Sequence, residues 1–271
     1  MGSLPLGQQT EYVSEYDAGL LYPIARVDKW VEMGIEAERL PFFGEDIWNA
    51  YEVSWLNLKG KPIVALVEFR LPYNSPNIIE SKSFKLYLNS LNQMRYESFV
   101  EVQILLERDL SEAAGAAVTV MLRDVDSMSA LVVLTPDYCI DELDVDITEY
   151  HPNAELLALD EAQGIVEERL VSHLLKSNCP VTNQPDWGSV FIDYKGTKID
   201  HEQLLKYIVS FREHTDFHEQ CVERIYIDLM RICKPETLIV YARYVRRGGL
   251  DINPYRASMP IVLGNDRLTR Q

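Results

Sequence analysis

The chain has 271 residues, of which 47% are hydrophobic and 25% charged, the composition of a soluble globular protein with one large core or two modules. Its formal net charge of −16 would repel a polyanion, so we expect no nucleic-acid partner. No stretch approaches the roughly 18 to 20 apolar residues that span a bilayer, so we expect no membrane association.

The four cysteines bear on the cellular compartment. Cys139, Cys179, Cys221 and Cys233 are widely spaced and match neither a disulfide framework nor a paired set of zinc ligands. The N-terminal sequence lacks the basic and apolar regions of a secretion signal. These features predict a protein of the reducing cytoplasm.

The first half of the chain predicts a hairpin followed by two helices. Two β-rich runs, 51–56 and 62–69, flank Lys59-Gly60-Lys61, which is typical of an antiparallel hairpin. Apolar residues at helical spacing and then in alternation predict the next elements. In chain order, these are helices over 81–92 and 96–110 and a strand over 117–122.

The second half predicts the same order of elements. In chain order, these are a strand over 189–194, a turn at Lys195-Gly196, helices over 201–212 and 218–230, and a strand over 237–244. Segment 167–177 has apolar spacing that suits a helix, but the repeated order favours a strand, and we predict a strand there. The acidic segment 137–160 has little periodicity, so we predict two modules, 1–150 and 151–271.

An offset of 120 residues aligns identical residues in the two halves. The aligned pairs are Tyr87 with Tyr207, Ser90 with Ser210, Val120 with Val240, and Arg123 with Arg243. Together with the repeated order of elements, they indicate an internal duplication.

Cys179 lies between Asn178 and Pro180 in a turn-rich loop, where a thiol is a candidate nucleophile. Asp186, the nearest ionisable residue in that loop, could take the thiol proton and return it to a nitrogen atom. The alternative is that Cys179 is a small buried apolar residue and that Asp186 forms a turn before Trp187.

His218 and Glu219 begin a predicted helix, where they are either a recognition pair or a helix cap and a first-turn residue. His214, His218 and Cys221 have a spacing that could bind zinc, although we expect no metal.

Positive charge gathers near these motifs and suits phosphate. Lys82, Lys85, Arg246 and Arg247 are accompanied by Gly248-Gly249, where backbone can approach a ligand closely. The alternative is a solvated helix face, above all for Lys85. No glycine-rich dinucleotide fingerprint follows a strand, so a dinucleotide would bind without a Rossmann fold.

Residues 80–87, Glu-Ser-Lys-Ser-Phe-Lys-Leu-Tyr, match at all eight positions the signature of the 7-cyano-7-deazaguanine reductases. With the Cys179 loop and His218-Glu219, the chain resembles the bimodular form of this family (QueF), the nitrile reductases of queuosine biosynthesis, over residues 11–256. The resemblance implies an α+β fold of tandem tunnelling-fold modules, with antiparallel sheets and helices packed on one face. It also implies a homodimer.

The resemblance further implies that two NADPH reduce the nitrile of 7-cyano-7-deazaguanine, a small deazapurine, through a covalent thioimide on Cys179, with Asp186 as the acid. The implied substrate-binding residues are Ile79, Glu80, Ser81, His218 and Glu219. The implied cofactor-binding residues are Ser81, Lys82, Lys85, Arg247 and Gly248. The alternatives are a thiol-dependent nitrile hydrolase and a non-catalytic purine-binding module.

The duplication is unequal in these residues. Glu80 and Lys82 align with Asp200 and Glu202, so the second half lacks the signature, while the nucleophile lies only there. We therefore expect neither half to be active alone.

Overall fold

The computed structural model describes residues 15–125 and 136–271. The helices are α1 (Val27–Glu32), α2 (Ser81–Ser90), α3 (Phe99–Ala114), α4 (His201–Ser210) and α5 (His218–Ile232). The strands are β1 (Pro23–Ala25), β2 (Phe43–Leu56), β3 (Pro62–Pro72), β4 (Asn77–Ile79), β5 (Thr119–Asp124), β6 (Tyr138–Cys139), β7 (Ile165–Ser172), β8 (Lys176–Asn178), β9 (Pro185–Thr197), β10 (Thr237–Tyr244) and β11 (Leu250–Ala257).

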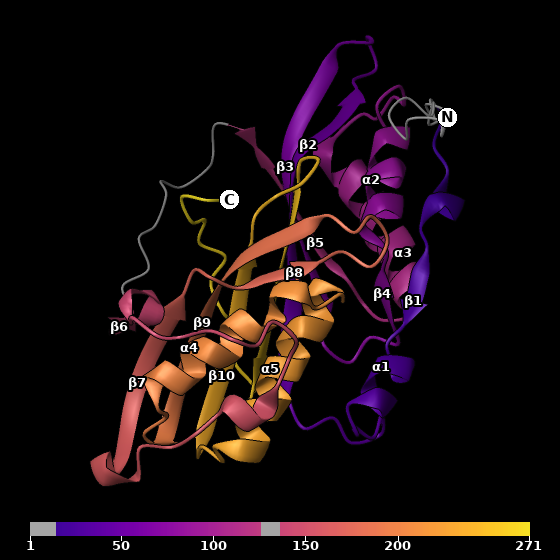
Figure 1. The fold of residues 1–271 in the computed structure, drawn as a ribbon. Coiled ribbons are helices and arrows are strands. Elements are labelled where there is room, and N and C mark those ends of the chain that lie inside the picture. Colours follow the sequence, from indigo (N-terminus) through magenta and orange to yellow (C-terminus); the bar gives the residue numbers. More distant parts are fainter. Residues whose placement is uncertain (1–14, 126–135) are drawn as a thin grey trace, which may run out of the picture.

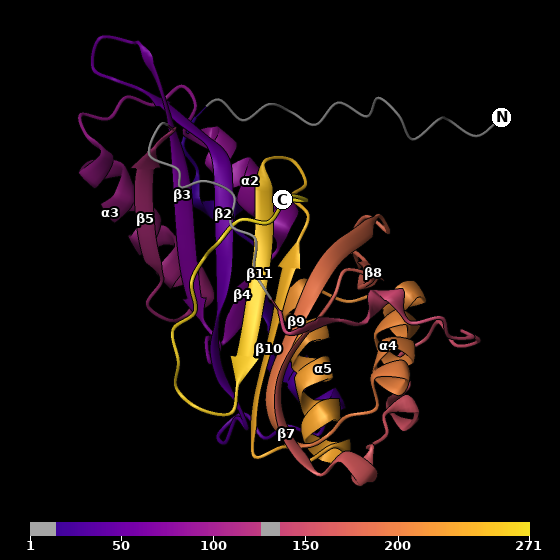
Figure 2. The same ribbon diagram turned by 90° about the vertical axis from the view of Figure 1, so that its left-hand side faces the viewer.

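One continuous sheet runs through both halves, in the order β5-β3-β2-β11-β10-β9-β7-β6 (Figure 2). The strand pairs are antiparallel except for the short parallel pair β6–β7. The halves meet where β11 pairs with β2 and Ile252 lies opposite Trp48. The long helices cover one face of the sheet (Figure 1), which confirms the predicted α+β class with helices on one side. No described helix has the length and apolar content to cross a membrane.

The duplication is visible in local geometry. Helices α2 and α4 begin and end 120 residues apart. The Tyr87 hydroxyl donates to Asp109 of α3 at 2.7 Å, and the Tyr207 hydroxyl donates to Asp228 of α5 at 2.9 Å. Each module thus ties its two helices together with the same buried tyrosine–carboxylate bond.

The predicted hairpin is confirmed as β2–β3, and segment 167–177 forms β7 and β8 rather than a helix. The predicted turn at Lys195-Gly196 is wrong, because β9 continues through it to Thr197 and pairs with β7 there. Gly196 instead allows the backbone of Pro235 to pack closely against β9, because a Cβ at this position would lie 2.9 Å from the Cα of Pro235.

Each of the two large hydrophobic cores contains residues from both sides of residue 150, the predicted boundary between the modules. The boundary itself stays a prediction. Trp30 and Ile140 belong to the core under α4 and α5, while Leu250 and Ile252 belong to the core under α2 and α3. Each half therefore completes the core of the other.

A buried ion network adds to this exchange. Arg256 of β11 contacts Asp46 of β2 at 2.8 Å and Glu223 of α5 at 2.7 Å, and Arg26 also pairs with Asp46. All four side chains are at most 2% exposed. The network ties the N-terminal segment, the β2–β11 junction and α5 into one unit.

Candidate active site

One narrow crevice on the helical face gathers most of the predicted site residues. Its walls are Ile79, Ser81, Cys179, Pro180, Asp186, Asp216, Phe217, His218, Glu219, Arg247 and Ile252. Its free volume of about 10 Å³ is room for one water molecule. A purine-sized ligand can therefore enter only if these side chains move.

The Cys179 loop follows β8 and closes on itself. The Cys179 amide donates to the Gln184 carbonyl and the Asn183 amide to the Cys179 carbonyl, both at 2.9 Å. Asn183 adopts a left-handed conformation, with φ of 52°, which asparagine tolerates better than most residues. This tight turn presents the thiol to the crevice, where Cys179 is only 6% exposed.

The environment of Cys179 favours the thiolate. Burial acts to raise the pKa of the thiol, but hydrogen bonds from the Thr182 side chain, from the Thr182 and Val181 amides and from Arg247 outweigh it. The net pKa is lowered, which increases the thiolate fraction at neutral pH. The role of Cys179 as a nucleophile stays a prediction.

Arg247, from the turn between β10 and β11, links Cys179 to Asp186. Its Nη2 lies 2.6 Å from Asp186 Oδ1, and its Nη1 donates to Gln184 Oε1 at 2.9 Å. Sequence reasoning missed this contact with Asp186. The Val245 amide donates to the Trp187 carbonyl at 2.8 Å, a pairing of distant segments that local sequence patterns do not reveal.

His218 and Glu219 occupy the first turn of α5. His218 Nε2 lies 3.4 Å from Asp186 Oδ2, within ion-pair distance, but it makes no aligned hydrogen bond. The His218 ring lies against Tyr244, with centroids 4.0 Å apart. Burial, followed by the charge of Asp46, raises the pKa of Glu219. This shift favours the protonated carboxyl group, which can both donate and accept a hydrogen bond.

The start of α2 forms the opposite wall. Ser81, its first residue, and Ile79 line the crevice, as the resemblance implies. Glu80 does not line it: its carboxylate accepts from the Lys82 and Ser83 amides at 2.9 and 2.7 Å and caps its own helix. The positive N-terminal ends of α2 and α5 thus meet at the site, an arrangement that favours anions.

Lys85, Arg247 and Gly248 lie together at the mouth of the crevice. Lys85 and Arg247 line an adjoining hollow, and a Cβ on Gly248 would lie 3.4 Å from Lys85 Cδ. Burial, followed by repulsion from Arg247, lowers the pKa of Lys85. Their two cationic groups suit a phosphate-bearing cofactor. Lys82 is exposed and does not line either hollow.

The zinc-like spacing of His214, His218 and Cys221 does not form a ligand set. Among the described residues, the donor atoms that come within 4.8 Å of one another belong to Cys139, Asp141 and His173, away from the crevice. The expected absence of a metal stays a prediction.

Comparison with known families gives two matches. Residues 12–122 match the family described as "Nitrile reductase, 7-cyano-7-deazaguanine-reductase N-term". Residues 185–260 match the family described as "QueF-like protein". The crystal structure of the archaeosine synthase QueF-Like in the apo form has a TM-score of 0.32 and 18% identity over 36% of this chain and 96% of its own. That structural similarity is too low to support an argument.

Proposed function

Because the chain belongs to the 7-cyano-7-deazaguanine reductase (QueF) family, we propose that it reduces the nitrile of 7-cyano-7-deazaguanine to the aminomethyl group with two NADPH, through a thioimide on Cys179. The observation that carries this proposal is one crevice that holds a thiol of lowered pKa beside a carboxylate fixed by an arginine.

The covalent step needs a nucleophile and a proton carrier. Asp186 takes the proton of the Cys179 thiol, and the thiolate adds to the nitrile carbon. The C–S bond forms as one C–N π bond breaks, and Asp186 gives the proton to the nitrogen. Arg247 holds the Asp186 carboxylate in place and stabilises the thiolate before the attack.

The remaining steps consume electrons. When bound, NADPH supplies the two hydrides that take the thioimide to an imine and the imine to the primary amine. Between the two reductions, the C–S bond breaks and Cys179 leaves as the thiolate, and a proton from solvent then reaches the nitrogen as the imine becomes the primary amine. Lys85, Arg247 and Gly248 would hold the cofactor phosphates at the crevice mouth.

The protein must also keep water from the thioimide, because hydrolysis would divert it to another product. The side chains that move to admit the substrate would have to close over the thioimide to provide this exclusion. Glu219 and His218 would bind the polar edge of the deazapurine. A protonated Glu219 can donate one hydrogen bond to the ring and accept another.

The test is the loss of nicotinamide absorbance on mixing the protein, NADPH and 7-cyano-7-deazaguanine, with nitrile consumption measured alongside. We expect two cofactors oxidised per nitrile. Cys179→Ala should lose turnover but keep non-covalent binding, whereas the control Cys139→Ala, outside the crevice, should keep both. Ammonia release without NADPH oxidation would identify a nitrile hydrolase. Binding without turnover in the unaltered protein would identify a purine-binding module.

A further inference from the structure

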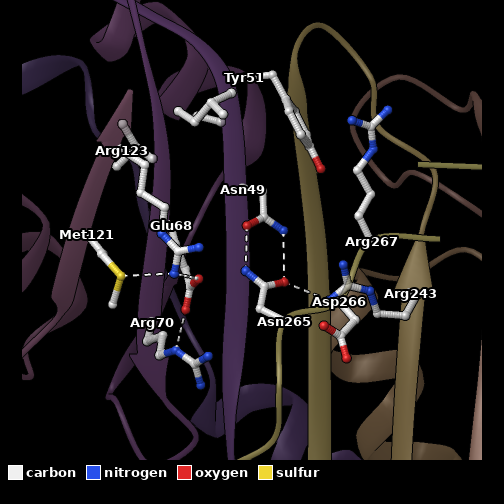
Figure 3. A pocket seen from close by; sticks show the side chains of 13 residues that line it. Asn49, Tyr51, Glu68, Arg70, Met121, Arg123, Arg243, Asn265, Asp266 and Arg267 are labelled. Atoms are coloured by element: carbon white, nitrogen blue, oxygen red, sulfur yellow. Dashed lines mark hydrogen bonds and ion pairs between the residues drawn. The ribbon is translucent and has the colours of Figure 1, made fainter. Parts of the chain in front are cut away.

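A cavity of about 440 Å³ lies on the face of the sheet opposite the helices (Figure 3). Its volume is within the range of small-molecule sites, about 300–1,000 Å³. Strands β2, β3 and β5 of the first half and β10 of the second form its floor, and the chain after β11 forms a wall. The cavity is thus separate from the crevice of Cys179.

Arginines dominate the charged lining of this cavity. The cavity is lined by two carboxylates, those of Glu68 and Asp266, and by four guanidinium groups, those of Arg70, Arg123, Arg243 and Arg267. Glu68 already pairs with Arg70 at 2.6 Å and with Arg123 at 3.6 Å. Within residues 15–125 and 136–271, no aspartate or glutamate carboxylate lies within 4.0 Å of Arg243 or Arg267, although Arg267 Nε donates to the main-chain oxygen of Gln271, the last residue, at 3.1 Å. Of the two, only Arg243 therefore makes all its hydrogen bonds to uncharged side chains.

Arg243 is only 1% exposed, so its positive charge is largely shielded from water. It donates to the Tyr241 hydroxyl, to Asn265 at 2.7 Å and to Gln271 at 2.8 Å, all of them neutral, and its Nη2 has no acceptor. A buried charge without an ionic partner is unfavourable. An anion in the adjacent cavity would supply the missing counter-charge.

The remaining lining is arranged around these cations. Arg267 lies over the Tyr51 ring at 5.4 Å, and Arg246 lies over it at 4.9 Å. Asn49 and Asn265 exchange two amide hydrogen bonds on the cavity floor, as Figure 3 shows. Tyr51 and the asparagine pair therefore hold the guanidinium groups around a polar hollow.

The duplication places equivalent residues here. Arg123 and Arg243, which are 120 residues apart, occupy matching strands β5 and β10, yet both reach the same cavity. Arg123 is 43% exposed and can contact a ligand directly, whereas Arg243 contributes charge from within the wall.

We propose that this cavity binds a small molecule through a phosphate group, with Arg267 and Arg123 as direct ligands and Arg243 as the counter-charge. The phosphate would belong to a ligand other than the cofactor, whose phosphates we place at Lys85, Arg247 and Gly248. The site itself does not depend on the proposed reductase activity.

Calorimetric titration with inorganic pyrophosphate at constant ionic strength tests the site without any turnover. We expect saturable binding to the unaltered protein, weakened at least about tenfold in Arg267→Gln, the loss expected for one charge-assisted contact. Arg123→Gln should also weaken it. The control Arg231→Gln removes the same charge from a side chain at the end of α5 that is 62% exposed, and it should leave pyrophosphate binding unchanged. Absence of saturable binding, or equal weakening in Arg231→Gln and Arg267→Gln, would overturn the proposal.

Steady-state kinetics then checks that this phosphate is not the cofactor's. If Arg267→Gln raises KM for NADPH but not for NADH, the cavity holds the 2′-phosphate of the cofactor, and the placement of that phosphate at Lys85, Arg247 and Gly248 is wrong. If both KM values stay unchanged while pyrophosphate binding is lost, the ligand is a separate molecule. An inactive protein that still binds pyrophosphate would contradict the reductase function and leave the anion site standing.

Discussion

The chemistry at Cys179 depends on a residue from a distant turn. Burial alone would leave the thiol protonated, yet hydrogen bonds from its own loop and from Arg247 lower its pKa. Arg247 also fixes Asp186 at 2.6 Å. One guanidinium therefore acts on both the ionisation of Cys179 and the position of Asp186, in addition to the cofactor contact that we propose for it.

Replacing Arg247 with glutamine should raise the pKa of Cys179. Because the thiolate is the reactive form, the rise of alkylation rate with pH should then shift to higher pH. Rates with iodoacetamide over a pH series, followed by mass spectrometry of Cys179, measure this shift.

The matched control is Arg212→Gln, which removes an arginine that lies 5.6 Å from the Trp187 ring and does not line the crevice. Its profile should follow that of the unaltered protein. An unchanged profile in Arg247→Gln would show that the loop amides and Thr182 alone set the thiol pKa.

Sequence reasoning identified the chemical groups of the crevice but not how they are held. Cys179, Asp186 and Ser81 were recognisable from local motifs, and the fold brings them together. Ile252 and Asp216 were not recognisable, because their place in the crevice depends on strand register and on helix packing. Residue type alone carries no signal for either.

The N-terminal caps of α2 and α4 are equivalent in structure, but we expect only the cap of α2 to affect substrate binding. Glu80 caps α2 through the Lys82 and Ser83 amides, and Asp200 caps α4 through the Glu202 and Gln203 amides. The caps are equivalent by the duplication, but Glu80 adjoins the crevice residue Ser81 and Asp200 does not.

Asp200→Ala should lower the free energy of unfolding by about 1 kcal/mol, the usual loss for a helix cap, and leave KM unchanged. Glu80→Ala should lose a similar amount and also raise KM, if it contacts substrate as the resemblance implies. Urea unfolding and steady-state kinetics measure the two effects. An unchanged KM in Glu80→Ala would restrict this residue to its structural role.

Local patterns predicted helices α2 to α5 but not strand β11, and the wrong prediction of a turn at Lys195-Gly196 has a physical cause. Helices α2 and α4 carry clear apolar stripes and caps, so their starts matched expectation. Lys195-Gly196 has the composition of a turn, but its glycine lies in β9 to let Pro235 approach. A glycine that permits a tertiary contact cannot be told from a turn glycine without the packing partner.

The two halves form one cooperative unit through shared cores and the buried ion network. Trp30 packs into the second core, while Ile252 packs into the first, and Arg26 links Asp46 with the distant Glu223. This exchange supports the expectation that neither half is active by itself.

Arg26→Met should destabilise the protein by about 3–5 kcal/mol, because it leaves the two buried carboxylates of Asp46 and Glu223 with a single guanidinium partner, that of Arg256. Arg169→Met breaks the exposed pair with Asp137 at 2.9 Å and should cost less than about 1 kcal/mol. Urea denaturation of both variants compares the two losses. Equal losses would mean that the network contributes no more than a surface ion pair.

The position of β11 in the sheet has a consequence for synthesis on the ribosome. Every residue of β11 is buried, and the strand lies between β10 and β2, which was translated some two hundred residues earlier. Until residues 250–257 emerge, β2 has a bare edge and the first core lacks Leu250 and Ile252. Folding therefore cannot finish from the N-terminus onward, and the nascent chain must keep an exposed strand edge until late in translation.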